Sequence, residues 1–493
     1  MGNSSFTASI HILDDDSLLN VFHLYRPFLL GEDEDEDVVR LIGGDKGWDR
    51  GRWWHKLSHV CQRWRRVILG SASYLGLSLV CTYGTPVADM LAHSPLLPLD
   101  IDYSNVNLEI AAEDEEGTIL AFKQYNRLRR VRLVLPVTIL QKFILAMDDE
   151  YPILEHLIIG RPDEDRSSIC QFPETLQAPN LRHLVLQGFT LPMGSRLLTT
   201  AVGLVTLCLV MIHPSTYFHP NILLRWLSFI PQLEMLMVTF FSPVSNWDVE
   251  RQLTHAPITT PIALPNLHSL VFEGLKTYLE ALVHWITTPR LEKLQIFFFN
   301  QLTFSVTHLL QFMNATENLT FKSAKLNFSD EQLDLEVYPH EKAEMYALSV
   351  TVNCWHLDWQ VSIAVQIFNS LSPLFSAVEH LTLEHWVHNR SSEEHDEADR
   401  IEWRQLFGSF RSVKTLRIDE GLVEKLSRCL ELDDGELPLE LLPELQELTY
   451  FGSGNTGDEF TSFIKARQNA GCPVTLVRSQ TRALPRDPLN PYR

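Results

Sequence analysis

Three six-residue stretches, LEHLII at Leu154–Ile159, LRHLVL at Leu181–Leu186 and LVTLCL at Leu204–Leu209, repeat one pattern of apolar residues. In each, an apolar residue is followed by a second one three positions later and by a third two positions after that. The last two alternate along the chain, so they point from one face of a short β-strand. The first anchors the turn into that strand. The pattern therefore predicts a series of short strands that bury the same face.

The triplet recurs along most of the chain. Successive first positions lie between 23 residues (Leu181 to Leu204) and 35 residues (Val378 to Val413) apart, except between Leu291 and Val378, where only blurred copies occur at Leu319/Phe321 and Leu348/Val350. Between triplets run amphipathic segments, such as Lys276 to Thr288, with apolar residues at helical spacing. One strand and one helix per repeat bury a continuous core only when the repeats stack. Other clear copies are Leu128/Val131/Leu133, Leu233/Leu236/Val238, Leu267/Leu270/Phe272, Leu291/Leu294/Ile296, Val378/Leu381/Leu383, Val413/Leu416/Ile418 and Leu445/Leu448/Tyr450.

This periodicity is typical of leucine-rich-repeat solenoids with long, irregular units. We therefore predict an α/β solenoid over residues 126–478, with a parallel β-sheet on the concave face and helices on the convex face. An ordinary α/β domain with a parallel sheet is the alternative, because its strands are also apolar and alternate with helices. The regular triplet favours the solenoid. We predict a connecting segment at 81–125 and a loosely ordered tail at 479–493.

The charge balance excludes several classes of partner. The 493 residues include 41 Lys plus Arg and 62 Asp plus Glu, which gives a net charge of −21. Nucleic-acid binders need a basic surface to displace counterions, and polybasic membrane-surface proteins need one to bind anionic lipids. We therefore expect neither a nucleic-acid nor a membrane partner. Seven scattered cysteines without a CxxC pair indicate reduced thiols, and we expect a cytoplasmic or nuclear protein.

Residues 8–80 differ from the repeats and predict a small helical domain. One apolar stripe runs from Ile12 to Leu24, and Asp14 to Asp16 would cap its helix at the positive end of the dipole. A second stripe runs from Trp54 to Ile68 at the spacing of an amphipathic helix. An acidic insertion at 28–51 separates the two halves.

The stretch Ser58–Arg65 (SHVCQRWR), preceded by the leucine-rich helix, resembles the F-box, the module by which substrate receptors join Skp/cullin ubiquitin ligases. An F-box followed by leucine-rich repeats is similar to the large F-box families of mushroom-forming fungi. The chain departs from the family pattern at Asp14, where Pro is usual, and in the long insertion. The resemblance implies a Skp-family adaptor and, through it, a cullin as partners. It implies adaptor-binding roles for Leu13, Leu18, Leu19, Phe22, Leu57, Val60, Cys61 and Trp64.

Core packing of the small helical domain is the alternative role for these apolar residues. A module of this size cannot bury all of them alone, so a partner would cover the excess. We predict no catalytic residue, cofactor or metal, because no nucleotide-binding, metalloprotease or serine-hydrolase motif is present. The cluster His380, Glu384, His385 and His388 is the strongest metal-like feature, and chance among 19 histidines explains it more simply.

The strand face opposite the leucines is the predicted target site. Residues that flank the last two apolar positions of a triplet point away from the core, yet several of them are apolar in successive repeats. We predict a contiguous apolar strip that binds an unidentified protein target. The alternative is that strands of a parallel sheet favour such residues and loops cover them. The predicted strip is Ile158, Val185, Met237 and Val271, flanked by Glu273, Lys293 and Arg417.

Together these observations predict a substrate-recognition subunit of a Skp/cullin-type ubiquitin ligase. Its helical domain would bind the adaptor and its repeats would bind the target. The alternative is a leucine-rich-repeat interaction scaffold with no ubiquitin-ligase association.

Overall fold

Two compact units, Met1–Leu209 and Val210–Arg493, make up the chain, and their boundary falls within strand β6 (Thr206–Ile212). Each unit is described by itself. The computed structural model describes residues 13–26, 52–105, 110–161, 172–189, 191–192, 194–213, 217–241, 261–299, 306–386, 400–431, 440–451 and 460–479. The predicted insertion at 28–51 lies outside these residues, and so does the predicted tail beyond Ser479.

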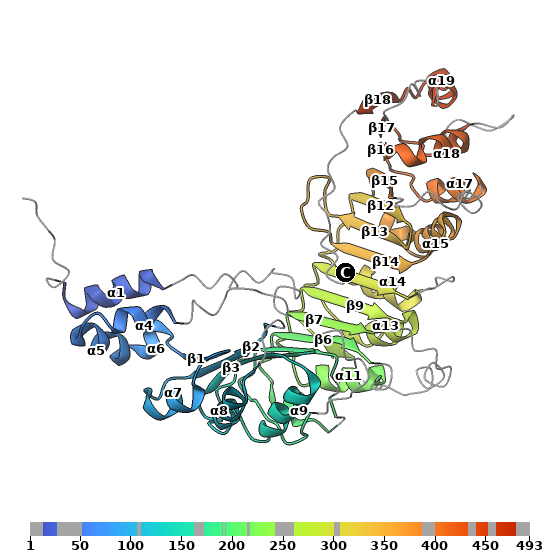
Figure 1. Ribbon diagram of the computed structural model, residues 1–493. Helices are drawn as coiled ribbons and strands as arrows, with labels where there is room; N and C mark the ends of the chain where they lie inside the picture. Colours follow the sequence, from blue (N-terminus) through green and yellow to red (C-terminus); the bar gives the residue numbers. More distant parts are fainter. Residues whose placement is uncertain are drawn as a thin grey trace, which may run out of the picture. The chain divides into compact units, whose positions relative to one another are not determined.

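Short helices at the N-terminus form a group that we call the head: α1 (Asp15–Tyr25), α4 (Trp53–Ser58), α5 (Gln62–Gly70) and α6 (Ala72–Leu75) (Figure 1). Leu18, Phe22, Ile68 and Leu75 are buried within it. The indole Nε1 of Trp54 donates a hydrogen bond to the carbonyl oxygen of Ser78 at 3.2 Å, just before the first strand. These helices lie within residues 8–80, where the sequence analysis placed a helical domain.

The rest of unit 1 alternates strands and helices, and its first five strands pair in parallel in the order β1–β2–β3–β4–β5. Val131, Leu157 and Leu184 stand at one register on neighbouring strands and are buried. The elements are β1 (Leu79–Cys81), α7 (Val87–His93), β2 (Leu99–Tyr103), α8 (Ala112–Phe122), β3 (Leu128–Val134), α9 (Val137–Ala146), β4 (His156–Gly160), β5 (His183–Gln187) and α10 (Arg196–Thr200).

The sheet begins at Leu79, so the assignment of 81–125 to a connecting segment was wrong. Strand β2 lies there, with α7 and α8 on either side of it in the sequence. Its sequence, LDIDY, contains no leucine triplet, but Leu99, Ile101 and Tyr103 fill the core in the same alternating way. The opposite face of this strand is polar and acidic, so its sequence does not match the apolar pattern of the other repeats.

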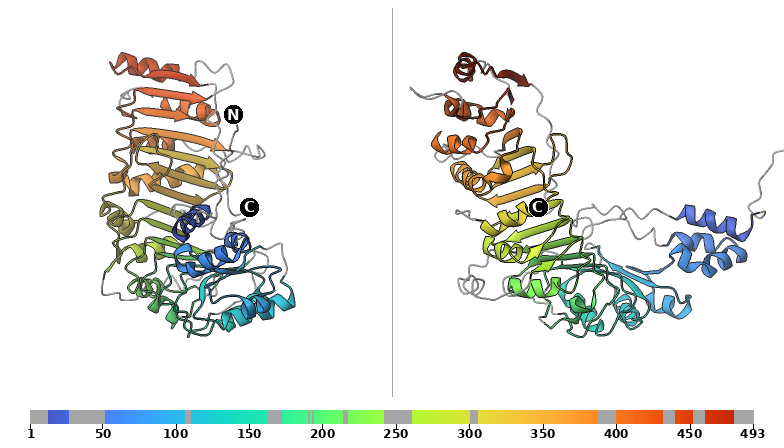
Figure 2. Two further views of the ribbon diagram at one scale, coloured as in Figure 1. Left: turned by 90° about the vertical axis from the view of Figure 1, so that its left-hand side faces the viewer. Right: turned by 180° about the vertical axis from the view of Figure 1, so that it is seen from behind.

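Unit 2 continues the same alternation, and the described helices lie along one side of its strands (Figure 2). Its main sheet has the order β7–β9–β11–β14–β13–β12–β15–β16–β17–β18, and β8 pairs separately with β10. The elements are α11 (Pro220–Leu227), β7 (Met235–Phe240), β8 (Ile262–Ala263), β9 (Ser269–Gly274), α13 (Lys276–Val283), β10 (Ile286–Thr287), β11 (Lys293–Phe298), α14 (Thr307–Asn314), β12 (Ser323–Ser329), β13 (Gln332–Tyr338), β14 (Leu348–Asn353), α15 (Leu357–Ser370), α16 (Ser372–Phe375), β15 (His380–Trp386), α17 (Arg400–Gly408), β16 (Thr415–Ile418), α18 (Glu420–Leu430), β17 (Glu447–Phe451), α19 (Thr461–Asn469) and β18 (Thr475–Ser479).

One strand runs against the others. Strand β13 pairs antiparallel with β12 on one side and with β14 on the other, whereas the other described strand pairs of this sheet are parallel. The predicted α/β class with a mainly parallel sheet is therefore confirmed, and the prediction of a wholly parallel sheet is corrected. A hairpin at this point also explains why the leucine triplet is blurred around residues 319–350, because a turn replaces the helical crossover there.

We expect Leu157→Ala to destabilise unit 1 by about 2–5 kcal/mol, because Leu157 is fully buried and the substitution leaves a cavity. The measurement is the midpoint of the first urea transition. Leu96→Ala is the matched control, because Leu96 is 86% exposed and its loss should change the midpoint little. Equal shifts for the two variants would contradict the assignment of Leu157 to the core.

Candidate functional site

The first helix of the head begins at a well-formed cap. Asp14 Oδ1 accepts a hydrogen bond from the backbone N–H of Ser17 at 2.7 Å, and hydrogen bonding to Ser17 lowers the pKa of Asp14. A charged carboxylate at this position satisfies an otherwise unpaired N–H and complements the helix dipole. Asp14, where the F-box pattern has proline, is therefore compatible with the helix.

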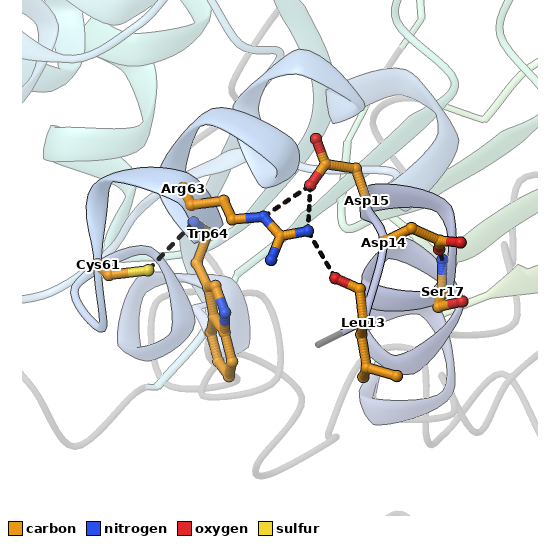
Figure 3. Close-up of polar contacts among 7 residues, drawn as sticks. All are labelled: Leu13, Asp14, Asp15, Ser17, Cys61, Arg63 and Trp64. Carbon is orange, nitrogen blue, oxygen red and sulfur yellow. Dashed lines mark hydrogen bonds and ion pairs between the residues drawn. The ribbon is translucent and has the colours of Figure 1, made fainter. Parts of the chain in front are cut away.

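Arg63 links the two halves of the head through hydrogen bonds (Figure 3). Its Nη2 donates to the carbonyl oxygen of Leu13 at 2.6 Å, and its Nε donates to Asp15 Oδ1 at 2.8 Å. Residues 27–51 separate these partners in the sequence, so Arg63 joins the start of α1 to α5 across the insertion. Cys61 caps α5, since its Sγ accepts from the N–H of Trp64 at 3.5 Å.

The predicted adaptor-binding residues divide into two groups. Leu18 and Phe22 are 0% and 1% exposed, and the ring of Trp64 packs edge-on against Phe22 with centroids 5.0 Å apart. Leu18 and Phe22 therefore form the core of the head rather than an exposed binding surface, which agrees with the alternative of core packing. Leu13, Leu19, Leu57, Cys61 and Trp64 are partly exposed, and Val60 is exposed.

The apolar surface of the head comes mainly from residues outside the predicted adaptor-binding set. On α1, Val21, Leu24 and Tyr25 are 42%, 82% and 58% exposed. Their spacing of three and four residues places them on one side of the helix. Tyr74 from α6 is also exposed, and its ring lies 5.3 Å from that of His23. Large apolar side chains in this position are typical of a surface that another molecule covers.

We expect Arg63→Met to loosen α1 from α5, because the substitution removes the contacts to Leu13 and Asp15. Hydrogen bonds to a charged group contribute about 1.5–3 kcal/mol, so amides in α1 should exchange with solvent about tenfold faster or more. Hydrogen exchange read by mass spectrometry measures this. Arg66→Met is the control, because Arg66 is exposed on the same helix. If the amides of α1 exchange at the same rate in the Arg63 variant as in the wild type, Arg63 does not hold α1 against α5.

The residues of the predicted target strip are in register in pairs within each unit, but they are mostly buried. Ile158 stands beside Val185, and Met237 stands beside Val271, each on neighbouring strands. Ile158 and Val271 are each 8% exposed, and Val185 is fully buried; only Met237 is partly exposed. The strip therefore offers little apolar surface to a target. The alternative interpretation, in which these side chains are covered, agrees with their burial.

The polar residues predicted to flank the strip already have neighbours of their own. The ammonium of Lys293 lies 5.1 Å from the ring centroid of Tyr346, and Arg417 forms an ion pair with Glu341 at 2.7 Å. Burial raises the pKa of Glu273 to about 7. The structure places each of these residues on a different strand and does not bring the three together.

The raised pKa of Glu273 makes the stability of unit 2 depend on pH. The folded carboxyl titrates near 7, whereas the unfolded one titrates at 4.5, so unfolding releases a proton between these values. Its contribution to the free energy of unfolding therefore falls as the pH rises through this window. At pH 8 we expect Glu273→Gln to be more stable than the wild type by about 1–3 kcal/mol, and near pH 4 we expect no difference. Urea titrations at both pH values measure this.

Glu344→Gln is the matched control for this experiment, because Glu344 is exposed. It should behave like the wild type at both pH values. A Glu273 variant with the same stability difference at pH 4 and pH 8 would show that the carboxyl is not held out of water.

Groups with potential for catalysis or metal binding were also considered. Burial raises the pKa values of Cys81, Cys208 and Cys429 to about 12, so these thiols are poor nucleophiles at neutral pH. On β15, His380 is hydrogen-bonded to Thr415 and Glu384 is paired with Lys325. His388 lies outside the described residues, within which no group of three candidate metal ligands was found. No helix in the described part is both long and apolar enough for a membrane span.

No protein-family model matches the sequence, and no curated protein matches it either. Among solved structures, the chain is similar to the leucine-rich repeat-containing protein LegL7 from Legionella pneumophila. The two share 12% sequence identity, the alignment covers 80% of this chain and 98% of that chain, and the TM-score is 0.25.

Proposed function

We propose that the protein is the substrate receptor of a Skp/cullin-type ubiquitin ligase, with the head as its adaptor-binding module. The observation that carries this proposal is the exposed apolar side of α1, formed by Val21, Leu24 and Tyr25. Leu18 and Phe22 already fill the core of the head from the same helix. The outward residues are therefore not needed for folding the head, and a partner helix could cover them.

The resemblance of the head to an F-box supports the identity of that partner. Two departures from the family pattern do not oppose it, because Asp14 caps α1 and Arg63 holds α1 against α5 across the insertion. A Skp-family adaptor would bind the head, and a cullin would join through the adaptor. Such a complex acts in the cytoplasm or the nucleus.

The repeats would supply the second half of the function. A stacked array of strands and helices is a rigid scaffold, and a target bound to it is held at a fixed distance from the adaptor. This raises the effective concentration of the target near the ubiquitin-loaded enzyme without chemistry by the receptor itself. The receptor is therefore proposed to be non-catalytic and to need no cofactor.

A repeat scaffold without ubiquitin-ligase association is the second candidate. The observation in its favour is the long insertion, residues 28–51, between α1 and α4, where the family has only a short connection. The two candidates differ in one measurable property, the binding of a Skp-family adaptor.

Co-expression of the full chain with a Skp-family adaptor tests the proposal. We expect the adaptor to co-purify with the wild type. Val21→Asp combined with Leu24→Asp should reduce the recovered adaptor about tenfold or more, because two unpaired charges would enter a dry interface. Since both residues are exposed, the variant should keep the circular dichroism and melting temperature of the wild type.

Leu96→Asp combined with Leu120→Asp is the matched control, because these leucines are exposed outside the head. It should retain the adaptor. Absence of the adaptor from the wild-type preparation would favour the scaffold function. Retention of the adaptor by the folded Val21/Leu24 variant would place the interface elsewhere.

A further inference from the structure

Strand β3 concentrates positive charge in a strongly acidic chain. Its sequence, LRRVRLV, contains Arg129, Arg130 and Arg132, whereas the net charge of the protein is −21. Val131 and Leu133 are buried in the leucine core. Because side chains alternate along a strand, Arg130 and Arg132 stand on the opposite face of the sheet.

The strand register brings further polar groups beside these two arginines. Arg130 stands between Asp100 on β2 and His156 on β4. Arg132 occupies the same position between Asp102 and Ile158, two residues further along. We call Asp102, Arg130, Arg132 and His156 the arginine face of unit 1.

The charges on this face are incompletely paired. Asp100 accepts hydrogen bonds from Ser78 Oγ at 2.6 Å and from Arg129 Nη2 at 3.1 Å, so Arg129 has its partner. In contrast, Arg130 Nε, Arg132 Nε and Asp102 Oδ2 are buried without a hydrogen-bond partner in the described part of the chain. Asp102 is also hydrogen-bonded to Ser104, but among the described residues it forms no ion pair with Arg132 within 4 Å. Buried polar groups of this kind are costly unless a ligand satisfies them.

The imidazole rings of the neighbouring histidines neither neutralise the two arginines nor add positive charge to this face. His156 stacks on His183 with ring centroids 4.5 Å apart. Burial, with Arg130 as the next cause, lowers the pKa of His156 to about 2, so its ring is neutral. Burial also raises the pKa of Asp102 to about 7, which weakens this carboxyl as a counter-charge. The carboxylates of Asp100 and Glu155 act on Arg130 from nearby, but neither Arg130 nor Arg132 has an ion pair within 4 Å among the described residues, and both side chains remain partly open to solvent.

We propose that the arginine face binds an extended, acidic peptide segment of a partner protein, in which carboxylate side chains alternate with other residues. Arg130 and Arg132 are two residues apart on a strand, so they are separated by about 6.6 Å along it. Carboxylates at alternate positions of an extended peptide have the same spacing. Each guanidinium can then hold one carboxylate in a charge-assisted pair. As an account of the ubiquitination target, this inference rests on the proposed function; peptide binding itself does not.

A nucleic acid fits this face less well than an acidic peptide. Two arginines can neutralise only two phosphates, and the acidic remainder of the chain repels a polyphosphate backbone. A short acidic peptide would place its negative charges only beside the two arginines, so the acidic remainder of the chain would repel it less. The difference between these two classes of ligand can be measured.

Fluorescence anisotropy with the full-length protein, purified without any adaptor, tests the proposal. The probe is a fluorescein-labelled octapeptide in which Glu alternates with Ser. The comparison peptide has the same composition arranged as Glu-Glu-Ser-Ser repeats, so that no two glutamates are two residues apart. We expect the alternating peptide to bind about tenfold more tightly or better. Equal affinity for the two peptides, no binding of either, or tighter binding of an oligothymidylate would overturn the proposal.

Three variants localise the binding. Arg130→Gln with Arg132→Gln should weaken the alternating peptide about tenfold or more, whereas the control Arg196→Gln, on α10, should not change it. Asp102→Asn should tighten binding severalfold, because it removes the carboxyl that competes for Arg132. Misfolding cannot produce such a gain, so this variant remains decisive if the double variant is unstable. Unchanged or weaker binding by Asp102→Asn would overturn the proposal, while adaptor co-purification would be unaffected by either result.

Discussion

The apolar face of each strand is buried only when neighbouring strands extend the same row of side chains and helices cover that row, and the architecture follows from this constraint. Leu157 on β4 stands in register with Val131 on β3 and Leu184 on β5, so one row of leucines and valines continues from repeat to repeat. A helix on the same side of the sheet shields this row of side chains from solvent. Because no single repeat could exclude water from this row, the stability of each depends on its neighbours.

The leucine triplet was sufficient to predict the strands that have it, including β4, β5, β7, β9 and β11. It could not predict β2, where Leu99 stands opposite the first triplet residue Leu128 but lies only two residues before Ile101, with a register shift between Leu99 and Asp100. It could not predict the direction of β13 either. Inward and outward side chains alternate in the same way in a parallel strand and in an antiparallel strand. Direction is decided by the connection, and here Asp330 and Glu331 alone join β12 to β13.

The candidate sites were less accessible to sequence reasoning, for two physical reasons. Helix α1 is apolar on more than one side, so spacing alone could not decide that Phe22 points inward while Leu24 points outward. Pairing of charges depends on distant parts of the chain: Arg417 meets Glu341, 76 residues away. The alternation that placed Arg130 and Arg132 on one face contained no information on whether Asp102 would neutralise them.

The reversed strand β13 has a consequence for the order in which unit 2 folds. Two parallel strands can pair only after the intervening crossover has been positioned, whereas β12 and β13 are joined by two residues and close a very small loop. Contacts between residues close in sequence form fastest. The hairpin, with Ser329 hydrogen-bonded to Gln332 at its turn, is therefore expected to be the nucleus from which the repeats on both sides are added.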